Sequence, residues 1–215
     1  LKSYTIRDAV KSVSCRSKTF YQGKNAEHHV VLYDYGHKSS ILYSLLERGC
    51  DVTVVPYNTT VEEIKKINPD GIMLSNGPGD PAENTEAIQI LRELMKTGIP
   101  IFGICLGHQL LALANGAKTA KLKYGHRGAN QPVADLIRDR VFITSQNHGY
   151  AVVSETLDPK IGFVSHTNGN DGSCEGITYK NANAFTVQFH PEACAGPQDT
   201  QYLFSKFVEM MKSTK

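Results

Sequence analysis

One cysteine in this sequence stands in a pattern that is typical of nucleophilic catalysis. Cys105 lies between two glycines in Gly103-Ile-Cys-Leu-Gly107, where an apolar run predicted as a strand meets a predicted helix. So tight a turn leaves no room for side chains two residues to either side. A helix that begins at Leu106 would direct its unpaired N–H groups toward the sulfur and favour the thiolate. The pattern predicts a nucleophile, although free cysteines are more often small buried side chains.

A cysteine nucleophile needs a base, and His190 is the best placed of the eight histidines. It follows a predicted strand over 184–188 and precedes Pro191, which favours an extended backbone at the histidine. In an extended segment residues i and i+2 face the same side, so Glu192 can orient the imidazole. The carboxyl ends of parallel strands are also where α/β sheets place their sites. His-Pro-Glu alone is a weak signal, but together with Cys105 it predicts a triad.

A turn-rich loop, Asn76-Gly-Pro-Gly-Asp-Pro81, follows another predicted strand. Backbone N–H groups in a glycine-rich turn can bind an anion, so this loop could complete an oxyanion hole. A simple surface turn is the alternative. The stretch from Gly77 to Ala82 also matches a dinucleotide-binding fingerprint. It follows the third predicted strand rather than the first, however, and no acidic residue ends the next strand.

Other chemistries find less support. His108, His126 and His148 lack the spacing of metal ligands, so we expect no metal on this chain. His190-Pro-Glu192 matches the H-x-E of zinc deaminases, but the P-C-x-x-C that these enzymes also need is missing. The sequence holds no Walker-type ATP motif.

The candidates lie within an alternation of short apolar runs and amphipathic segments. Strands are predicted over 29–34, 52–55, 71–75 and 99–104. Helices are predicted around 41–46, after a capping box of Thr60 and Glu63, over 83–97 and over 106–115. From residue 117 onward, strands are predicted over 141–144, 150–153, 161–164 and 184–188, before a last helix over about 198–213. The alternation predicts a parallel α/β sheet, and the later strands a mixed or antiparallel addition.

Composition narrows the class of protein. The 215 residues suffice for one domain, and 40% hydrophobic with 20% charged residues is typical of a globular chain. The net charge is +2 without runs of like charge, so we expect neither nucleic acid nor a membrane surface as a partner. Five cysteines without C-x-x-C and without a signal peptide indicate a reducing compartment, and we expect a cytoplasmic location.

Residues 1–27 are polar and aperiodic. We interpret them as a linker from a missing N-terminal domain, a reading that a first residue of Leu rather than Met also suggests. The domain itself is then expected over 28–215.

Three motifs resemble those of the class I (triad) glutamine amidotransferases: Gly103-Ile-Cys-Leu-Gly-His-Gln109, Ser75-Asn-Gly-Pro-Gly-Asp-Pro81 and Phe189-His-Pro-Glu192. Segments 124–132, 144–150, 170–176 and 195–199 are similar to the glutaminase part of carbamoyl-phosphate synthase. The likeness extends from about residue 28 to 212. It implies a three-layer, flavodoxin-like α/β fold with a central, mostly parallel sheet, helices on both faces and a smaller antiparallel addition.

The resemblance also implies roles for single residues. Cys105 aligns with the nucleophile, and His190 and Glu192 align with the other triad members. The backbone N–H groups of Leu106 and Gly79 would be the oxyanion donors. Further positions fall where the family holds glutamine, namely Gly77, Gly79, Leu106, Gln109, Asn147, Gly149 and Tyr150. Many members carry Phe where this chain has Tyr150.

The implied activity is hydrolysis of L-glutamine through a cysteinyl thioester. In the family, the ammonia passes to a large synthetase subunit or domain that makes carbamoyl phosphate for pyrimidine or arginine biosynthesis. ATP, Mg and bicarbonate belong to that partner, and we expect no cofactor on this chain. The alternatives are a glutaminase for anthranilate, aminodeoxychorismate or GMP synthesis, an inactive regulatory scaffold, and a cysteine peptidase or γ-glutamyl hydrolase. Segments 127–132 and 195–199 argue against the first, and the complete triad argues against the second.

Overall fold

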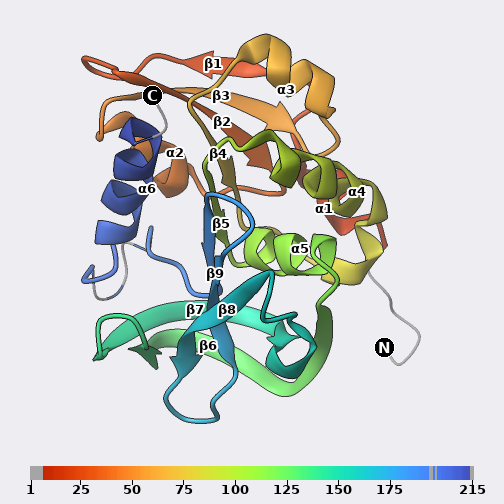
Figure 1. Ribbon diagram of the computed structural model, residues 1–215, viewed down its shortest axis with the longest axis vertical. Helices are drawn as coiled ribbons and strands as arrows, with labels where there is room; N and C mark the ends of the chain where they lie inside the picture. Colours follow the sequence, from red (N-terminus) through yellow and green to blue (C-terminus); the bar gives the residue numbers. More distant parts are fainter. Residues whose placement is uncertain (1–6, 194–195, 197, 214–215) are drawn as a thin grey trace.

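A ten-stranded sheet organises the residues that the computed structural model describes, which are 7–193, 196 and 198–213. Figure 1 shows the sheet running the length of the molecule. Its strand order is β1 (Thr19–Tyr21), β3 (Cys50–Pro56), β2 (His28–Asp34), β4 (Gly71–Leu74), β5 (Ile101–Ile104), β10 (Ala184–Val187), β9 (Cys174–Tyr179), β8 (Gly162–Asn168), β6 (Lys118–Asp135) and β7 (Arg140–Val153).

The first half of the sheet is the predicted parallel α/β unit. Strands β3, β2, β4, β5 and β10 pair in parallel. Because helices cover both faces, these strands are buried along almost their whole length and do not alternate between buried and exposed residues. Helices α2 (Ser39–Leu46) and α6 (Tyr202–Lys212) pack on one face. The other face carries α1 (Ala9–Val13), α3 (Val61–Ile67), α4 (Thr85–Leu94) and α5 (Leu106–Ala114). The predicted three-layer arrangement is confirmed (Figure 1).

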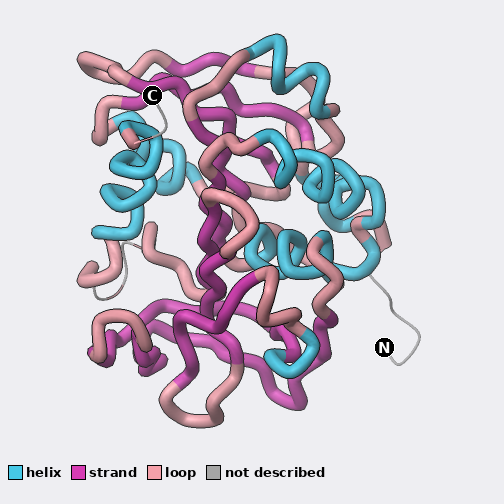
Figure 2. The backbone as a smooth tube through the Cα atoms, in the orientation of Figure 1, coloured by secondary structure: helices cyan, strands magenta, loops and turns pink. Residues whose placement is uncertain are grey.

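The second half of the sheet is antiparallel from β10 through β9, β8 and β6 to β7. Figure 2 shows that the helices gather around the parallel half, while this half consists mostly of strands and loops. The sequence predicts two strands over 141–144 and 150–153, but the structure has one continuous strand, β7. It also has β6 and β9, for which the sequence predicts nothing. Only two of the 18 residues of β6 are buried, so it lacks the apolar pattern of a buried strand.

Local signals identify several element ends correctly. The predicted capping box at the start of α3 is formed, with Thr60 and Glu63 satisfying each other's backbone N–H groups. The helix predicted over 83–97 is instead divided into a 3₁₀ turn at Pro81–Glu83, α4, and a second 3₁₀ turn at Met95–Thr97. No helix among the described residues is long and apolar enough to cross a membrane.

The segment before residue 28 contains structure that the sequence does not predict. Helix α1 inserts Val10 into the core, where it is 1% exposed. Strand β1 forms the edge of the sheet and pairs antiparallel with β3 through its backbone, so its exposed side chains give no signal. Residues 1–6 and parts of the segment 195–199 lie outside the described residues. The assignment of 1–27 as an interdomain linker stays a prediction.

Candidate active site

Cys105 occupies the sharp turn between β5 and α5. Its φ of 52° and ψ of −101° are unusual for a residue with a side chain. The turn is held by two backbone hydrogen bonds, from Cys105 N–H to the Val187 carbonyl (2.9 Å) and from Gly107 N–H to the Ser75 carbonyl (3.0 Å). A Cβ at Gly107 would lie 2.5 Å from the carbonyl oxygen of Leu74. This is the crowding predicted for the glycines two residues to either side of Cys105.

His190 and Glu192 meet beside Cys105 just beyond the end of β10. The Nδ1 atom of His190 lies 2.7 Å from Oε1 of Glu192, and both side chains are buried. The backbone N–H of His190 donates to the Ser145 carbonyl on β7 (2.9 Å), which fixes the backbone that carries the ring. Since Nδ1 faces Glu192, the other ring nitrogen is available to the sulfur of Cys105, with which the His190 side chain interacts. The structure therefore brings the three predicted triad residues together.

The charges in this group favour the protonated form of His190. Burial lowers the pKa of His190, but the negative sulfur of Cys105 and the carboxylate of Glu192 outweigh it and raise that pKa to about 10. Burial alone would raise the pKa of Glu192, but His190 and Lys38 hold it below its ordinary value. The Lys38 ammonium lies 3.2 Å from Oε1 of Glu192. At neutral pH His190 is thus a protonated imidazole, held by the buried Glu192 carboxylate.

A cavity of about 270 Å³ opens in front of this group. It is lined by Gly36, Lys38, Asn76, Gly77, Pro78, Cys105, Asn147 and His190. Two loops form most of its rim. The N–H of Lys38 donates to the Asn76 side-chain oxygen (3.1 Å), and the Asn76 amide donates to the Gly36 carbonyl (3.0 Å). Gly77 must lack a side chain, because a Cβ there would collide with the Tyr35 carbonyl oxygen.

The other predicted site residues lie behind or beside the cavity. Leu106 and Gln109 are buried in α5. The Gln109 amide donates to the Tyr150 carbonyl (2.7 Å) and to the Gln188 side chain (2.8 Å), so it ties α5 to β7. Gly79 has a φ of +91° in the loop after β4, and Gly149 lies on β7. Partial burial and the nearby Asp80 carboxylate raise the pKa of Tyr150. Their binding roles stay predictions.

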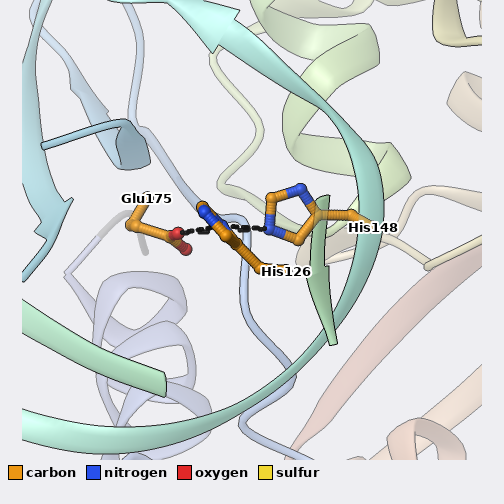
Figure 3. Close-up of side chains that lie close together, drawn as sticks. All are labelled: His126, His148 and Glu175. Atoms are coloured by element: carbon orange, nitrogen blue, oxygen red, sulfur yellow. Dashed lines mark hydrogen bonds and ion pairs between the residues drawn. The ribbon is translucent and has the colours of Figure 1, made fainter. Parts of the chain in front are cut away.

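Two features were missed from the sequence. Lys38 follows β2, and the carboxyl ends of β2, β4 and β5 lie at the same edge of the sheet. Its position after a parallel strand is the sequence signal that could have identified Lys38 as a site residue. His126, His148 and Glu175 form a compact cluster of side chains whose types can ligate a metal (Figure 3). No spacing in the sequence indicates that cluster.

Comparison with known proteins identifies the family. The family model for glutamine amidotransferase class-I matches residues 31–210. The chain belongs to the class I glutamine amidotransferase family. A Bacillus cereus protein named carbamoyl phosphate synthase small chain is 53% identical over all 215 residues, which cover 58% of its length. A protein of the same name from Listeria innocua is 59% identical over 182 residues, or 85% of this chain and 50% of that protein. The chain therefore spans about half the length of these relatives.

Solved structures agree on the fold of this amidotransferase chain. A protein named as a GMP synthase subunit from Thermoplasma acidophilum has a TM-score of 0.74 at 22% identity, covering 86% of this chain and 94% of that one. A glutamine amidotransferase from Thermotoga maritima has a TM-score of 0.61 at 19% identity, covering 89% and 86%. At these identities the likeness concerns the fold alone.

Proposed function

We propose that this chain is a glutaminase that hydrolyses L-glutamine to glutamate and ammonia. The observation that carries the proposal is the placement of Cys105 in a strained turn beside the buried imidazole of His190. Glu192 holds that imidazole through a contact of 2.7 Å between its Oε1 atom and Nδ1 of His190. An activated thiolate, a protonated base and an orienting carboxylate are the parts that acyl transfer needs.

The reaction begins with attack of the Cys105 sulfur on the side-chain carboxamide carbon of glutamine. The imidazolium of His190 donates its proton to the amide nitrogen as the C–N bond breaks, so ammonia leaves and a γ-glutamyl thioester remains. His190, now neutral, accepts a proton from a water molecule that attacks the thioester. The C–S bond then breaks, which releases glutamate and restores the thiolate and the imidazolium.

We assign the oxyanion hole to the backbone N–H groups of Leu106 and Gly79. Leu106 is the first residue of α5, so its N–H has no partner within the helix, and the helix dipole adds positive potential there. Gly79 brings a second N–H from the loop after β4. Gly77, Gln109, Asn147, Gly149 and Tyr150 would hold the rest of the glutamine. Losing one such donor typically costs about 10²–10³ in rate.

We further propose that the ammonia serves a carbamoyl-phosphate synthase. The support is identity of 53% and 59% to small chains from two genera, over all or most of this chain. The partner is then a large synthetase chain or domain, which uses ATP, Mg and bicarbonate, and the product enters pyrimidine or arginine biosynthesis. The free thiols Cys15, Cys50, Cys105 and Cys174 fit a reducing, cytoplasmic location.

Trapping the thioester tests the glutaminase assignment. The chain is incubated with ¹⁴C-glutamine and quenched in acid, and the label is located by peptide mapping. We expect label on the peptide that contains Cys105, none in Cys105→Ala, and unchanged labelling in the matched control Cys15→Ala. An unlabelled wild-type chain, with and without an added synthetase chain, would favour the inactive scaffold.

A second assay tests the partner. A large chain of carbamoyl-phosphate synthase is added together with ATP and bicarbonate. Glutamine should then support carbamoyl phosphate formation in the wild type, whereas Cys105→Ala should need free ammonia. Glutaminase activity that never yields carbamoyl phosphate would point to another biosynthetic acceptor.

A further inference from the structure

A second polar group lies in the antiparallel half of the sheet, outside the triad. His126 on β6 faces His148 on β7 across a direct strand pair, and Glu175 on β9 reaches the same point. Figure 3 shows His126 between the other two side chains. The Nδ1 atom of His126 lies 3.1 Å from Nε2 of His148 and 3.3 Å from Oε1 of Glu175, and the last two atoms are 4.0 Å apart.

These separations suit a tetrahedral metal ion. Zinc bonds of about 2.0–2.1 Å to nitrogen and oxygen place neighbouring ligand atoms about 3.4 Å apart. The three observed separations bracket that value. The side-chain oxygen of Gln146 lies 3.0 Å from Nε2 of His148 and is the nearest further donor for a fourth position. His126 is 12% exposed while His148 and Glu175 are almost fully buried, so an ion would enter from the His126 side.

Each imidazole has an inner nitrogen that faces the cluster (Nδ1 of His126 and Nε2 of His148) and an outer nitrogen that faces away from it. Hydrogen bonds to the outer nitrogens fix how the inner ones are presented. Nε2 of His126 lies 2.8 Å from the Asp171 carboxylate, and Nδ1 of His148 lies 2.7 Å from the Tyr150 carbonyl oxygen. Both partners only accept, so each outer nitrogen carries the hydrogen. In the neutral rings the inner nitrogens then present lone pairs to each other and to Glu175. A carboxylate or carbonyl on the outer nitrogen is the usual support of a metal-ligating histidine.

The buried Glu175 carboxylate needs a positive charge beside it. The Glu175 side chain is completely buried. Asn168 donates to its Oε1 atom (3.1 Å), but Oε2 has no hydrogen bond among the described residues. A buried carboxylate without full hydrogen bonding is costly unless a cation compensates it. Without an ion, the His126 imidazole 3.3 Å away supplies that charge, because Glu175 and Asp171 raise the pKa of His126 to about 9. A bound metal ion would take the place of that proton.

We infer that His126, His148 and Glu175 form a binding site for a divalent transition-metal ion, with Zn²⁺ as the best match for two imidazoles and one carboxylate. The ion joins β6, β7 and β9 and plays a structural part. This departs from the expectation of no metal, which rested on sequence spacing alone. His148 lies between Asn147 and Gly149 on β7, so under the proposed function the ion also fixes backbone that contacts glutamine.

Metal binding is measured directly, without an activity readout. The full chain carrying Cys105→Ala is stripped with chelator and titrated with Zn²⁺, with Co²⁺ as an optical probe, and the metal content is checked by elemental analysis. The Cys105→Ala background removes the thiolate–imidazole pair as a competing site. We expect one equivalent of metal and the visible spectrum of tetrahedral Co²⁺.

Variants of the cluster distinguish a metal ion bound by the three side chains from a proton shared between the two imidazoles. His126→Gln and Glu175→Gln should lose the bound equivalent, whereas His29→Gln, a matched histidine on β2, should keep it. Asp171→Asn removes only the carboxylate charge beside Nε2 of His126 and should weaken metal binding by about 10–100-fold. This variant replaces a ligand variant that does not fold. No bound equivalent in the parent, or affinity unchanged in all cluster variants, would overturn the site and leave a proton between the imidazoles. Thioester trapping is scored separately, so either proposal can fail alone.

Discussion

Replacing Glu192 by Gln removes the charge beside His190 but keeps a side chain of nearly the same shape. The bond from His190 Nδ1 to Glu192 is 2.7 Å long and buried, so it is a charge-assisted hydrogen bond. Such bonds contribute about 1.5–3 kcal/mol, which corresponds to roughly 10- to 150-fold in rate. A glutamine oxygen can still accept from Nδ1, so the tautomer survives. We therefore expect kcat for glutamine hydrolysis to fall by that factor with little change in KM.

The comparison with His190→Asn makes this prediction sharp. Loss of the general acid–base group itself costs about 10²–10⁴ in rate, so His190→Asn should be the more damaging change. Because the Glu192 carboxylate raises the pKa of His190, Glu192→Gln should also move the alkaline limb of the kcat/KM profile to lower pH. The exposed Glu93→Gln is the matched control and should behave as wild type. Equal damage from the two triad variants, or an alkaline limb that moves upward, would refute the assigned roles.

Three further predictions concern the frame of the site. Lys38→Met removes a half-exposed ion pair to Glu192 and should lower kcat by no more than about fivefold in the same assay. Gly107→Ala places a Cβ 2.5 Å from a backbone carbonyl and should cost about 1–3 kcal/mol or more in urea unfolding, whereas Gly149→Ala meets nothing closer than 3.6 Å and should unfold like wild type. Burial lowers the pKa of His108 to about 3, so the stability that its neutral form contributes is present above about pH 6.5 and lost as the pH falls toward 3. The unfolding free energy of His108→Gln should therefore decline less steeply with acid, by up to about 1.4 kcal/mol per pH unit.

The parallel half of the fold was predictable because its signals are local. Strands covered on both faces are continuous apolar runs, as in β2, and the helices between them end at glycines or begin at capping boxes. The antiparallel half was only partly predictable. Strand β6 is 18 residues long but has only two buried residues, and its pairing with β7 contains two irregularities. The register between two such strands leaves little trace in the sequence of either strand.

The same distinction separates the site residues. Cys105 and the His190–Glu192 pair follow from short motifs, because the turn after β5 and the extended segment after β10 fix their side chains locally. Lys38 reaches Glu192 only through the packing of the loops after β2 and β4. The cluster at His126 depends on a cross-strand register and on a third strand, so the histidine spacing along the chain could not indicate it.

Strand β7 links the two groups of polar residues, since successive side chains of a strand point to opposite sides. The Asn147 side chain lines the cavity beside Cys105, and the backbone carbonyl of Ser145 accepts the backbone N–H of His190. Gln146 and His148 turn the other way, into the cluster with His126. A change of charge at His148 is therefore one peptide unit away from Asn147. An ion at the cluster would hold the strand that positions both the base and the substrate-side wall, without taking part in the chemistry at the sulfur.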